Sequence, residues 1–293
     1  MKPLMVFSFG GWSASKPLYT TLYKNKVVCK SIVKEPNILP AIIAKDPHIT
    51  SHKYDYCKRE NIEGREVFLY TNVEDYIEWL LRYHNSECLG VSDATNTHSI
   101  FGVDDIATFA SKFKEAFQVK VLIICRDPVK RLFSHLNTVH VNWHIYEKLY
   151  GQSQDNLTQN KKLEIVMPYL DHPEPMQFPG QGWDYRKKAF EPYMESNYPE
   201  MIANWSQFFD THVICMEDLW GDRNSALEKL NTFLGTSITS LTPNAYYPDL
   251  GPNAPHHQGL RDQWSSDTEF ITKKNYDLAR EKLDWVYQSL PYW

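Results

Sequence analysis

The sequence predicts an α/β fold in which a central parallel sheet is flanked by helices in three layers. Three features support this prediction: short apolar runs that suit buried strands, helical apolar spacing in the segments between them, and the alternation of the two along the chain. The run 119–125 is apolar on both faces, which is typical of a central strand in a parallel sheet. The 293 residues suffice for a substantial core, so we expect a single domain over 1–293.

The first half of the chain predicts strands and helices in alternation. Apolar runs predict strands at 4–9, 67–70, 88–91 and 119–125. Apolar residues at helical spacing predict helices at about 17–23, 73–84 and 104–117. Proline residues interrupt the periodic pattern over 24–65, where loops and short elements are expected.

The second half continues the pattern after a change of composition. A helix is expected to begin at Pro128, because proline suits the first helical turn. The segment 150–192 is first polar and then rich in proline, glycine and aromatic residues, which predicts an insertion that closes over an acceptor or packs its aromatics on the core. Beyond it we expect a helix at 198–209, a strand at 213–216, and helices at 225–234, capped by Gly235, and at about 270–290.

Composition excludes several classes of protein. The net charge is −5 with acids and bases interspersed, which disfavours non-specific nucleic-acid binding. The sequence contains no apolar run near the ~20 residues of a membrane span, and its first residues enter a strand without a signal-peptide pattern. The five cysteines are scattered and form no C-x-x-C pair, which suits reduced thiols. We therefore expect a soluble, cytoplasmic protein.

The strand at 119–125 is followed directly by residues that suit an oxyanion. Arg126 stands at the end of the strand, and Ser134 lies about two turns along the helix that follows. A guanidinium offers a planar fork of donors, and a hydroxyl adds another, at the edge where open α/β sheets bind their ligands. The alternative is an ordinary junction with Arg126 in a structural ion pair.

This stretch, R-D-P-x-x-R-x-x-S, resembles the 3′-phosphate-binding motif of sulfotransferases that use 3′-phosphoadenosine-5′-phosphosulfate (PAPS). The resemblance implies that Arg126 and Ser134 hold the 3′-phosphate of PAPS. A later run, 198–235, is similar to the family segment Y-x-x-x-L-x-x-W…F…EDL…FLG. Arg261 lies where a basic loop of the family contacts the same phosphate, although the paired bases of that loop are missing.

The loop after the first strand predicts a second anion site and gives the fold a P-loop-like character. Backbone N–H groups at a helix N-terminus bind anions, and Lys16 adds a full charge, unless it is merely a solvated lysine. Against G-x-x-x-x-G-K-[ST], Ser15 replaces the second glycine and Pro17 replaces the hydroxyl that would hold Mg²⁺, which disfavours a kinase. The family resemblance implies that this loop holds the 5′-phosphosulfate, with these residues: Ser13, Ala14, Ser15, Lys16, Pro17 and Leu18. The family lysine usually stands at the position of Ser13 or Ala14, so Lys16 would act from a shifted position.

A third polar cluster follows the apolar run 88–91. In carbohydrate sulfotransferases a segment of the form D-x-S/T-P carries a carboxylate that acts as general base, and Asp93 matches that carboxylate without the proline. The resemblance implies that Asp93 is the general base, with His98 at the family's aromatic position. By its chemistry His98 is a second candidate, because either side chain accepts the proton if it reaches the acceptor hydroxyl. On the residues alone, Asp93 is equally well a helix cap or a turn former.

The pattern as a whole predicts a PAPS-dependent sulfotransferase that acts on a hydroxyl or amine of a small-molecule or carbohydrate acceptor. No metal is expected: His140 and His144 have helical spacing, but no third ligand stands at a suitable distance in the sequence. Two alternatives are a P-loop kinase that uses ATP and Mg²⁺ and a non-catalytic nucleotide- or glycan-binding module.

Overall fold

The computed structural model describes a large part of the chain in two compact units. The described residues are 2–10, 15–29, 38–44, 72–94, 101–136, 164, 167, 170, 198–220, 223–240 and 272–288. One unit comprises Met1–Cys125 with Glu200–Asn244, and the other comprises Arg126–Pro199 with Ala245–Trp293. The single domain expected from the sequence stays a prediction.

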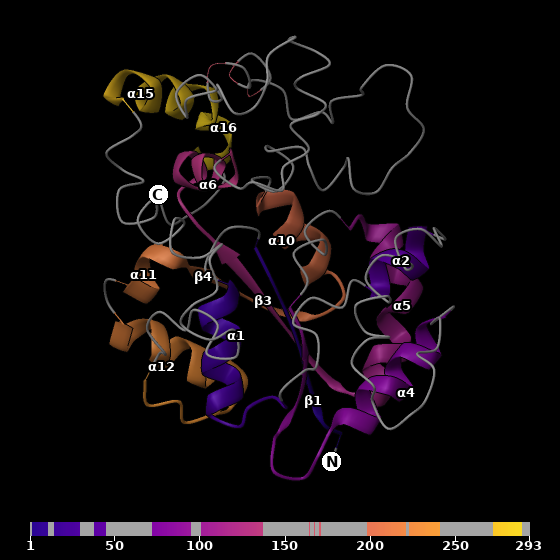
Figure 1. Ribbon diagram of the computed structural model, residues 1–293. Helices are drawn as coiled ribbons and strands as arrows, with labels where there is room; N and C mark the ends of the chain where they lie inside the picture. Colours follow the sequence, from indigo (N-terminus) through magenta and orange to yellow (C-terminus); the bar gives the residue numbers. More distant parts are fainter. Residues whose placement is uncertain are drawn as a thin grey trace, which may run out of the picture. The chain divides into compact units, whose positions relative to one another are not determined.

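The first unit contains a four-stranded parallel sheet (Figure 1). Its strands, in the spatial order β2-β1-β3-β4, are β2 Gly90–Asp93, β1 Leu4–Phe9, β3 Gln118–Cys125 and β4 Asp210–Cys215. Every pair of neighbours is parallel, with β1 between β2 and β3. Helices cover both faces, so the α/β fold with a central parallel sheet is confirmed.

One face of the sheet packs aliphatic side chains against three helices. These are α1 Ser15–Lys24, α11 Met216–Trp220 and α12 Arg223–Leu234. Alternation along the strands directs Leu4 and Val6 of β1 to this face, where they meet Leu18 and Leu22 of α1. Gly235 ends α12 with a φ of 67°, as a C-cap glycine does, so the predicted cap is confirmed.

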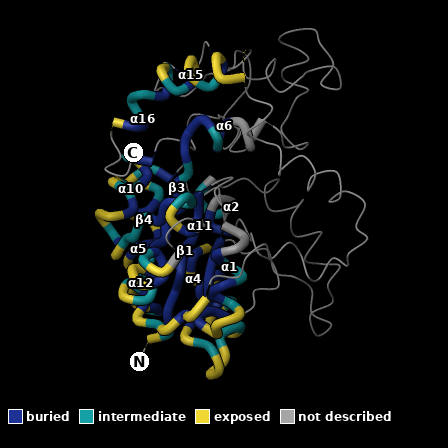
Figure 2. Tube along the Cα trace, turned by 90° about the vertical axis from the view of Figure 1, so that its left-hand side faces the viewer, coloured by how far each residue is buried: buried dark blue, intermediate teal, exposed yellow. Residues whose placement is uncertain are grey.

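The opposite face is aromatic. It is covered by α4 Val73–Tyr83, α5 Val103–Ala116 and α10 Tyr198–Ser206, with the short α2 Ile38–Ala44 beside α4. The ring of Phe7 in β1 lies 5.2 Å from that of Phe113 in α5 and 5.3 Å from that of Trp205 in α10, measured between centroids. Such ring pairs add to the burial of apolar area. Figure 2 shows β1 as buried, while the helices α4, α5 and α12 expose their outer sides.

The second unit packs the C-terminal helices around the helix that follows β3. Its elements are α6 Pro128–Leu136, α15 Lys273–Lys282 and α16 Asp284–Gln288. Val129 and Leu132 of α6 are buried, as are Leu283 and Val286 near the end of the chain. The indole N–H of Trp285 donates to the carbonyl of Leu170 at 3.3 Å.

Several element boundaries differ from the prediction. β2 begins at Gly90 and includes Asp93, because that segment pairs with β1, whereas the sequence predicted a strand over 88–91. A short helix, α11, follows β4 directly, and the helix predicted over 270–290 is divided at Leu283 into α15 and α16. The predicted strand 67–70 lies outside the described residues.

Candidate functional site

The carboxyl edge of the sheet is the place where its topology favours a ligand. All four strands end at this edge, and the chain leaves β1 toward β2 on one side and β3 toward β4 on the other. The order of connection therefore reverses between β1 and β3, which is where open α/β sheets bind ligands. Gly10, directly after β1, has a φ of 140°, and a Cβ at this position would lie 2.0 Å from the carbonyl oxygen of Ile124 in β3. Only glycine fits here.

Two buried hydroxyls near this edge have no partner among the described residues. They belong to Ser8, which is fully buried, and Ser92, which is 5% exposed. Ser92 is paired with Val6 in the register, so strand alternation places both hydroxyls on the face that α1 covers. A buried hydroxyl without a partner costs free energy and calls for an explanation, such as a bound ligand. Both hydroxyls therefore lie on the face of the sheet that α1 covers and have no partner among the described residues.

The predicted phosphosulfate loop leads into α1, which begins at Ser15, two residues earlier than expected. Lys16 therefore stands in the first helical turn, followed by Pro17, which brings no N–H group. Leu18 is 1% exposed and packs in the aliphatic core, so it can offer only its backbone to a ligand. Ser13 and Ala14, and the side chains of Ser15, Lys16 and Pro17, lie outside the described residues.

Asp93 is the last residue of β2 and has no exposed surface. Its Oδ2 accepts a hydrogen bond of 2.7 Å from the hydroxyl of Tyr76 in α4, which ties the strand to that helix. The sequence suggested that Asp93 lies beyond the strand, as a helix cap or turn residue. In the structure Asp93 lies within β2 and does not begin a described helix. The second candidate base, His98, lies outside the described residues.

The start of α6 is held by the carboxylate of Asp127, which is buried. Oδ1 accepts from the backbone N–H of Lys130 at 2.8 Å, and the Asp127 carbonyl accepts from the N–H of Arg131 at 2.8 Å. Oδ2 accepts from the hydroxyl of Tyr276 in α15 at 2.9 Å. Asp127 therefore caps α6 and connects it to the C-terminal helices, which fixes the segment that carries the predicted phosphate ligands.

Tyrosine hydroxyls complete this junction. The backbone N–H of Arg126 donates to the hydroxyl of Tyr198 at 3.2 Å. Burial, followed by the charge of Asp127, raises the pKa of Tyr276 to about 12, and the same two causes raise the pKa of Tyr287. Tyr276 is therefore protonated at neutral pH and donates to Asp127. The pair Asp127-Pro128 after the strand is an N-cap signal that the sequence analysis missed. Tyr198 and Tyr276 could not be predicted from the sequence, because they are distant from this pair in the chain.

The two arginines of the motif differ in exposure. Arg131 is fully buried, so it is a structural part of the second unit, while Arg126 is only partly buried. Arg126 is therefore the arginine of the pair that a ligand can reach. Ser134 lies within α6, as expected from the spacing, and its side chain lies outside the described residues.

Comparison with known proteins gives distant structural likenesses. The sequence matches no protein-family model and no curated protein. The structure is similar over nearly its full length to bacterial sulfotransferases. The sulfotransferase from Alicyclobacillus acidocaldarius matches with a TM-score of 0.49 and 16% identity over 97% of this chain and 96% of that chain. A sulfotransferase domain from the curacin biosynthetic pathway matches with a TM-score of 0.48 and 13% identity over 97% of this chain and 98% of that chain. A sulfotransferase domain from the Synechococcus PCC 7002 olefin synthase matches with a TM-score of 0.47 and 13% identity over 95% of this chain and 94% of that chain. At these scores the likenesses assign neither substrates nor catalytic residues.

The remaining predicted site residues lie outside the described part of the chain. They are Arg261, the histidines His140 and His144, and the insertion 150–192 except for residues 164, 167 and 170. Among the residues that the structure describes, no three His, Cys, Asp or Glu side chains gather in a way that could bind a metal ion. Within the same residues, no helix is long and apolar enough to span a bilayer.

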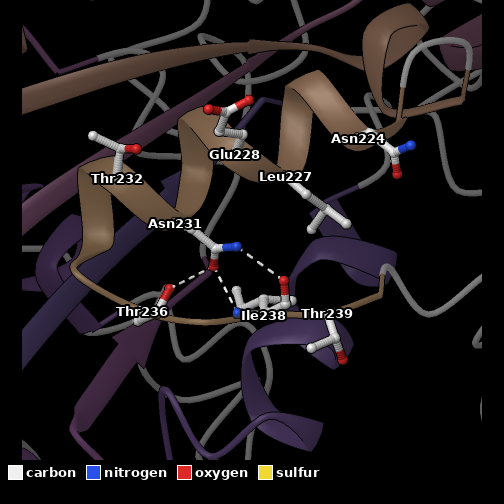
Figure 3. A pocket seen from close by; sticks show the side chains of 8 residues that line it. All are labelled: Asn224, Leu227, Glu228, Asn231, Thr232, Thr236, Ile238 and Thr239. Atoms are coloured by element: carbon white, nitrogen blue, oxygen red, sulfur yellow. Dashed lines mark hydrogen bonds between the residues drawn. The ribbon is translucent and has the colours of Figure 1, made fainter.

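A pocket of about 440 Å³ lies on α12 and the segment after it, and its described lining residues include no strand end (Figure 3). Its polar groups serve the chain itself: the side-chain amide of Asn231 donates to the carbonyl of Ile238 at 2.9 Å, and its oxygen accepts from the N–H of Ile238 at 2.7 Å and from Thr236 at 2.9 Å. Among the described residues of its lining, Glu228 is the one that carries a charge. This pocket does not suit an anionic donor.

Proposed function

We propose that this protein is a sulfotransferase that takes a sulfuryl group from PAPS and transfers it to a hydroxyl or amine of a small-molecule or carbohydrate acceptor. The observation that carries the proposal is the position of the R-D-P-x-x-R-x-x-S motif. Arg126 directly follows β3 at the carboxyl edge, and Ser134 stands on α6, whose start Asp127 caps. The motif thus has the strand-to-helix context that its phosphate-binding role requires.

The donor has two anionic ends, and the chain offers a separate group of residues for each. Arg126, Ser134 and Arg261 would hold the 3′-phosphate by charged hydrogen bonds. The backbone N–H groups at the start of α1 and the charge of Lys16 would hold the 5′-phosphosulfate, as the unpartnered hydroxyls of Ser8 and Ser92 support. We expect no metal to be required, because Pro17 stands where a Mg²⁺-binding hydroxyl would be needed.

The residues of the chain would promote transfer by alignment and by charge. PAPS, when bound, supplies the sulfuryl group. Lys16 would neutralise the negative charge that grows on the bridging oxygen as the sulfur–oxygen bond breaks. Asp93 or His98 would accept the proton that the acceptor loses when it bonds to sulfur. The cytosol remains our expected compartment, which agrees with the lack of a disulfide bond among the described cysteines.

Ligand binding separates this proposal from the kinase. In calorimetric titrations the protein should bind adenosine 3′,5′-bisphosphate without metal and should bind ATP with Mg²⁺ more weakly. A preference for ATP with Mg²⁺ would contradict the proposal. Turnover of radiolabelled PAPS on a panel of hydroxyl and amine acceptors then separates an enzyme from a binding module, because a module would bind the bisphosphate without transferring label.

Substitution of Asp93 tests the assignment of the base. If Asp93 is the base, Asp93→Asn lowers turnover by on the order of 10²–10⁴-fold and removes the acidic limb of the pH–rate profile, with PAPS affinity nearly intact. Tyr76→Phe is the matched control, because it removes the 2.7 Å hydrogen bond to Asp93 and keeps the carboxylate. Equal losses of activity in the two variants would show that Asp93 acts only by holding α4, and His98 would then be the residue to replace.

Lys16 should act on the donor side. Lys16→Ala should lower kcat by ~10²-fold, with donor affinity falling less, because the charge it neutralises develops only in the transition state.

A further inference from the structure

Two cysteines that are far apart in the sequence lie together where β2 begins. The segment after α1 pairs with the start of β2: the N–H of Gly90 donates to the carbonyl of Val27 at 3.1 Å, and the N–H of Cys29 donates to the carbonyl of Gly90 at 2.8 Å. An isolated parallel bridge between Val28 and Gly90 belongs to the same pairing. The backbone of Cys29 is thus fixed beside the residues that precede β2.

The thiol of Cys29 meets the turn that carries Cys88. Its Sγ accepts a hydrogen bond of 3.4 Å from the backbone N–H of Asn85, and the N–H of Cys88 closes the turn on the carbonyl of Asn85 at 3.2 Å. Cys29 is 5% exposed, whereas Cys88 is only partly buried. One thiol is therefore enclosed, and its neighbour can be reached from solvent.

We propose that Cys29 and Cys88 are a redox pair that forms a reversible intramolecular disulfide. With glutathione disulfide as oxidant, the Cys88 thiolate attacks one of its sulfurs and releases one glutathione as its thiolate. The Cys29 thiolate then attacks the Cys88 sulfur of the mixed disulfide and releases the second glutathione. The protein loses two protons and two electrons, and the electrons reduce the disulfide of the oxidant to two thiols.

The surroundings of Cys88 make this exchange slow at neutral pH. Burial, then a hydrogen bond with Cys29 and its charge, raise the pKa of the Cys88 thiol to about 11. Glu87 raises the pKa further and Lys26 lowers it, and these two side chains pair with each other at 3.5 Å. The ring of His84 contacts the backbone carbonyl of Cys88 at 3.2 Å. The rate of oxidation should rise about tenfold for each pH unit from 7 to 10, because the thiolate is the nucleophile.

The position of the pair determines what the bond would change. It lies where β2 begins, whereas Asp93 and the proposed chemistry lie where β2 ends. The disulfide would close a loop over residues 30–87, and such a bond stabilises a fold mainly by restricting the unfolded chain. We therefore expect oxidation to raise the melting temperature by about 5 °C and to leave turnover little changed. This inference is independent of the proposed function.

The experiment equilibrates the full-length protein in glutathione buffers of increasing oxidised fraction, blocks free thiols, and maps peptides without reduction. The expected result is a peptide pair joined through Cys29 and Cys88 that disappears on reduction. Cys29→Ser and Cys88→Ser should abolish it, while Cys57→Ser and Cys215→Ser should retain it. Because Cys88 is partly exposed, Cys88→Ser should fold even if the buried Cys29→Ser does not.

Three results would overturn the inference. The first is the absence of the joined peptide at every glutathione ratio. The second is a Cys88 that stops at the mixed disulfide with glutathione, and the third is a bond between Cys88 and another cysteine such as Cys57. A joined peptide with the stated dependence on Cys29 and Cys88 would support it.

Discussion

The strand-to-helix junctions that follow β1 and β3 differ in the hydrogen bonding of their buried polar groups. After β3, the carboxylate of Asp127 accepts from Lys130 and Tyr276, and the N–H of Arg126 reaches Tyr198. Near the end of β1, the hydroxyls of Ser8 and Ser92 have no partner among the described residues. Described residues therefore satisfy Asp127 and the N–H of Arg126 at one junction, whereas the two hydroxyls near the other junction have no partner among the described residues.

This difference suits the two anionic ends of the proposed donor. A phosphate that only has to be bound is best held by a rigid site, because ordering the site in advance lowers the entropy cost of binding. A group that reacts needs donors that become fully satisfied as charge develops on it. The substitutions that follow probe the two junctions, from the largest expected effect to the smallest.

Gly10→Ala should have the largest effect, because the backbone after β1 cannot accommodate a side chain. The added Cβ would lie 2.0 Å from the carbonyl oxygen of Ile124 at a φ of 140°, so we expect a loss of ~3 kcal/mol or more in the free energy of unfolding. Gly235→Ala is the control, since its φ is 67° and the space around it is open, and it should cost only ~1 kcal/mol. Urea denaturation measures both, and equal losses would show that the close approach to β3 is unimportant.

Substitution of Arg126 at the β3 junction should weaken nucleotide binding more than it lowers the free energy of unfolding. Arg126→Ala should weaken binding of adenosine 3′,5′-bisphosphate by ~2–3 kcal/mol, the scale of a charged hydrogen bond, and should hardly affect adenosine 5′-phosphate. Lys130→Ala is the control, because it also removes a positive charge but at a motif position with no proposed ligand. It should change the affinity for neither nucleotide. Equal losses for both nucleotides in a calorimetric titration would show that Arg126 does not bind the 3′-phosphate.

Removal of one hydroxyl should change the free energy of unfolding in opposite directions at the two junctions. Ser8→Ala should raise the free energy of unfolding of the ligand-free protein by ~1 kcal/mol, because it removes a buried group without a partner. Tyr276→Phe should lower it by ~1 kcal/mol, because it leaves Oδ2 of Asp127 without its 2.9 Å donor. A destabilised Ser8→Ala would mean that its hydroxyl is satisfied by water or by the loop after Gly10.

The sequence predicted those features that depend on local pattern. The uniform apolar run of β3, the helical spacing after Pro128 and the C-cap at Gly235 are all local, and the structure confirms them. The end of β2 was placed wrongly, because Ser92 and Asp93 look like turn residues until their pairing with Val6 and Phe7 of β1 is known. Tyr276 could not be found either, because its contact with Asp127 spans 149 positions of the chain.

The last and smallest effect concerns alkaline pH, where only the β3 junction should respond. The pKa of Tyr276 is raised from its ordinary value of 10.0 to about 12, so folding favours the protonated hydroxyl. Its stabilising contribution is complete below pH 10 and is lost as the pH rises through about 12, because the ionised oxygen can no longer donate to Asp127. Tyr276 is partly exposed, so solvent screening keeps this contribution small. Urea denaturation from pH 9 to 12 should show a fall in stability that is reduced in Tyr276→Phe and unchanged in Ser8→Ala. An identical pH dependence in all three proteins would show that Tyr276 does not hold α6 through its proton.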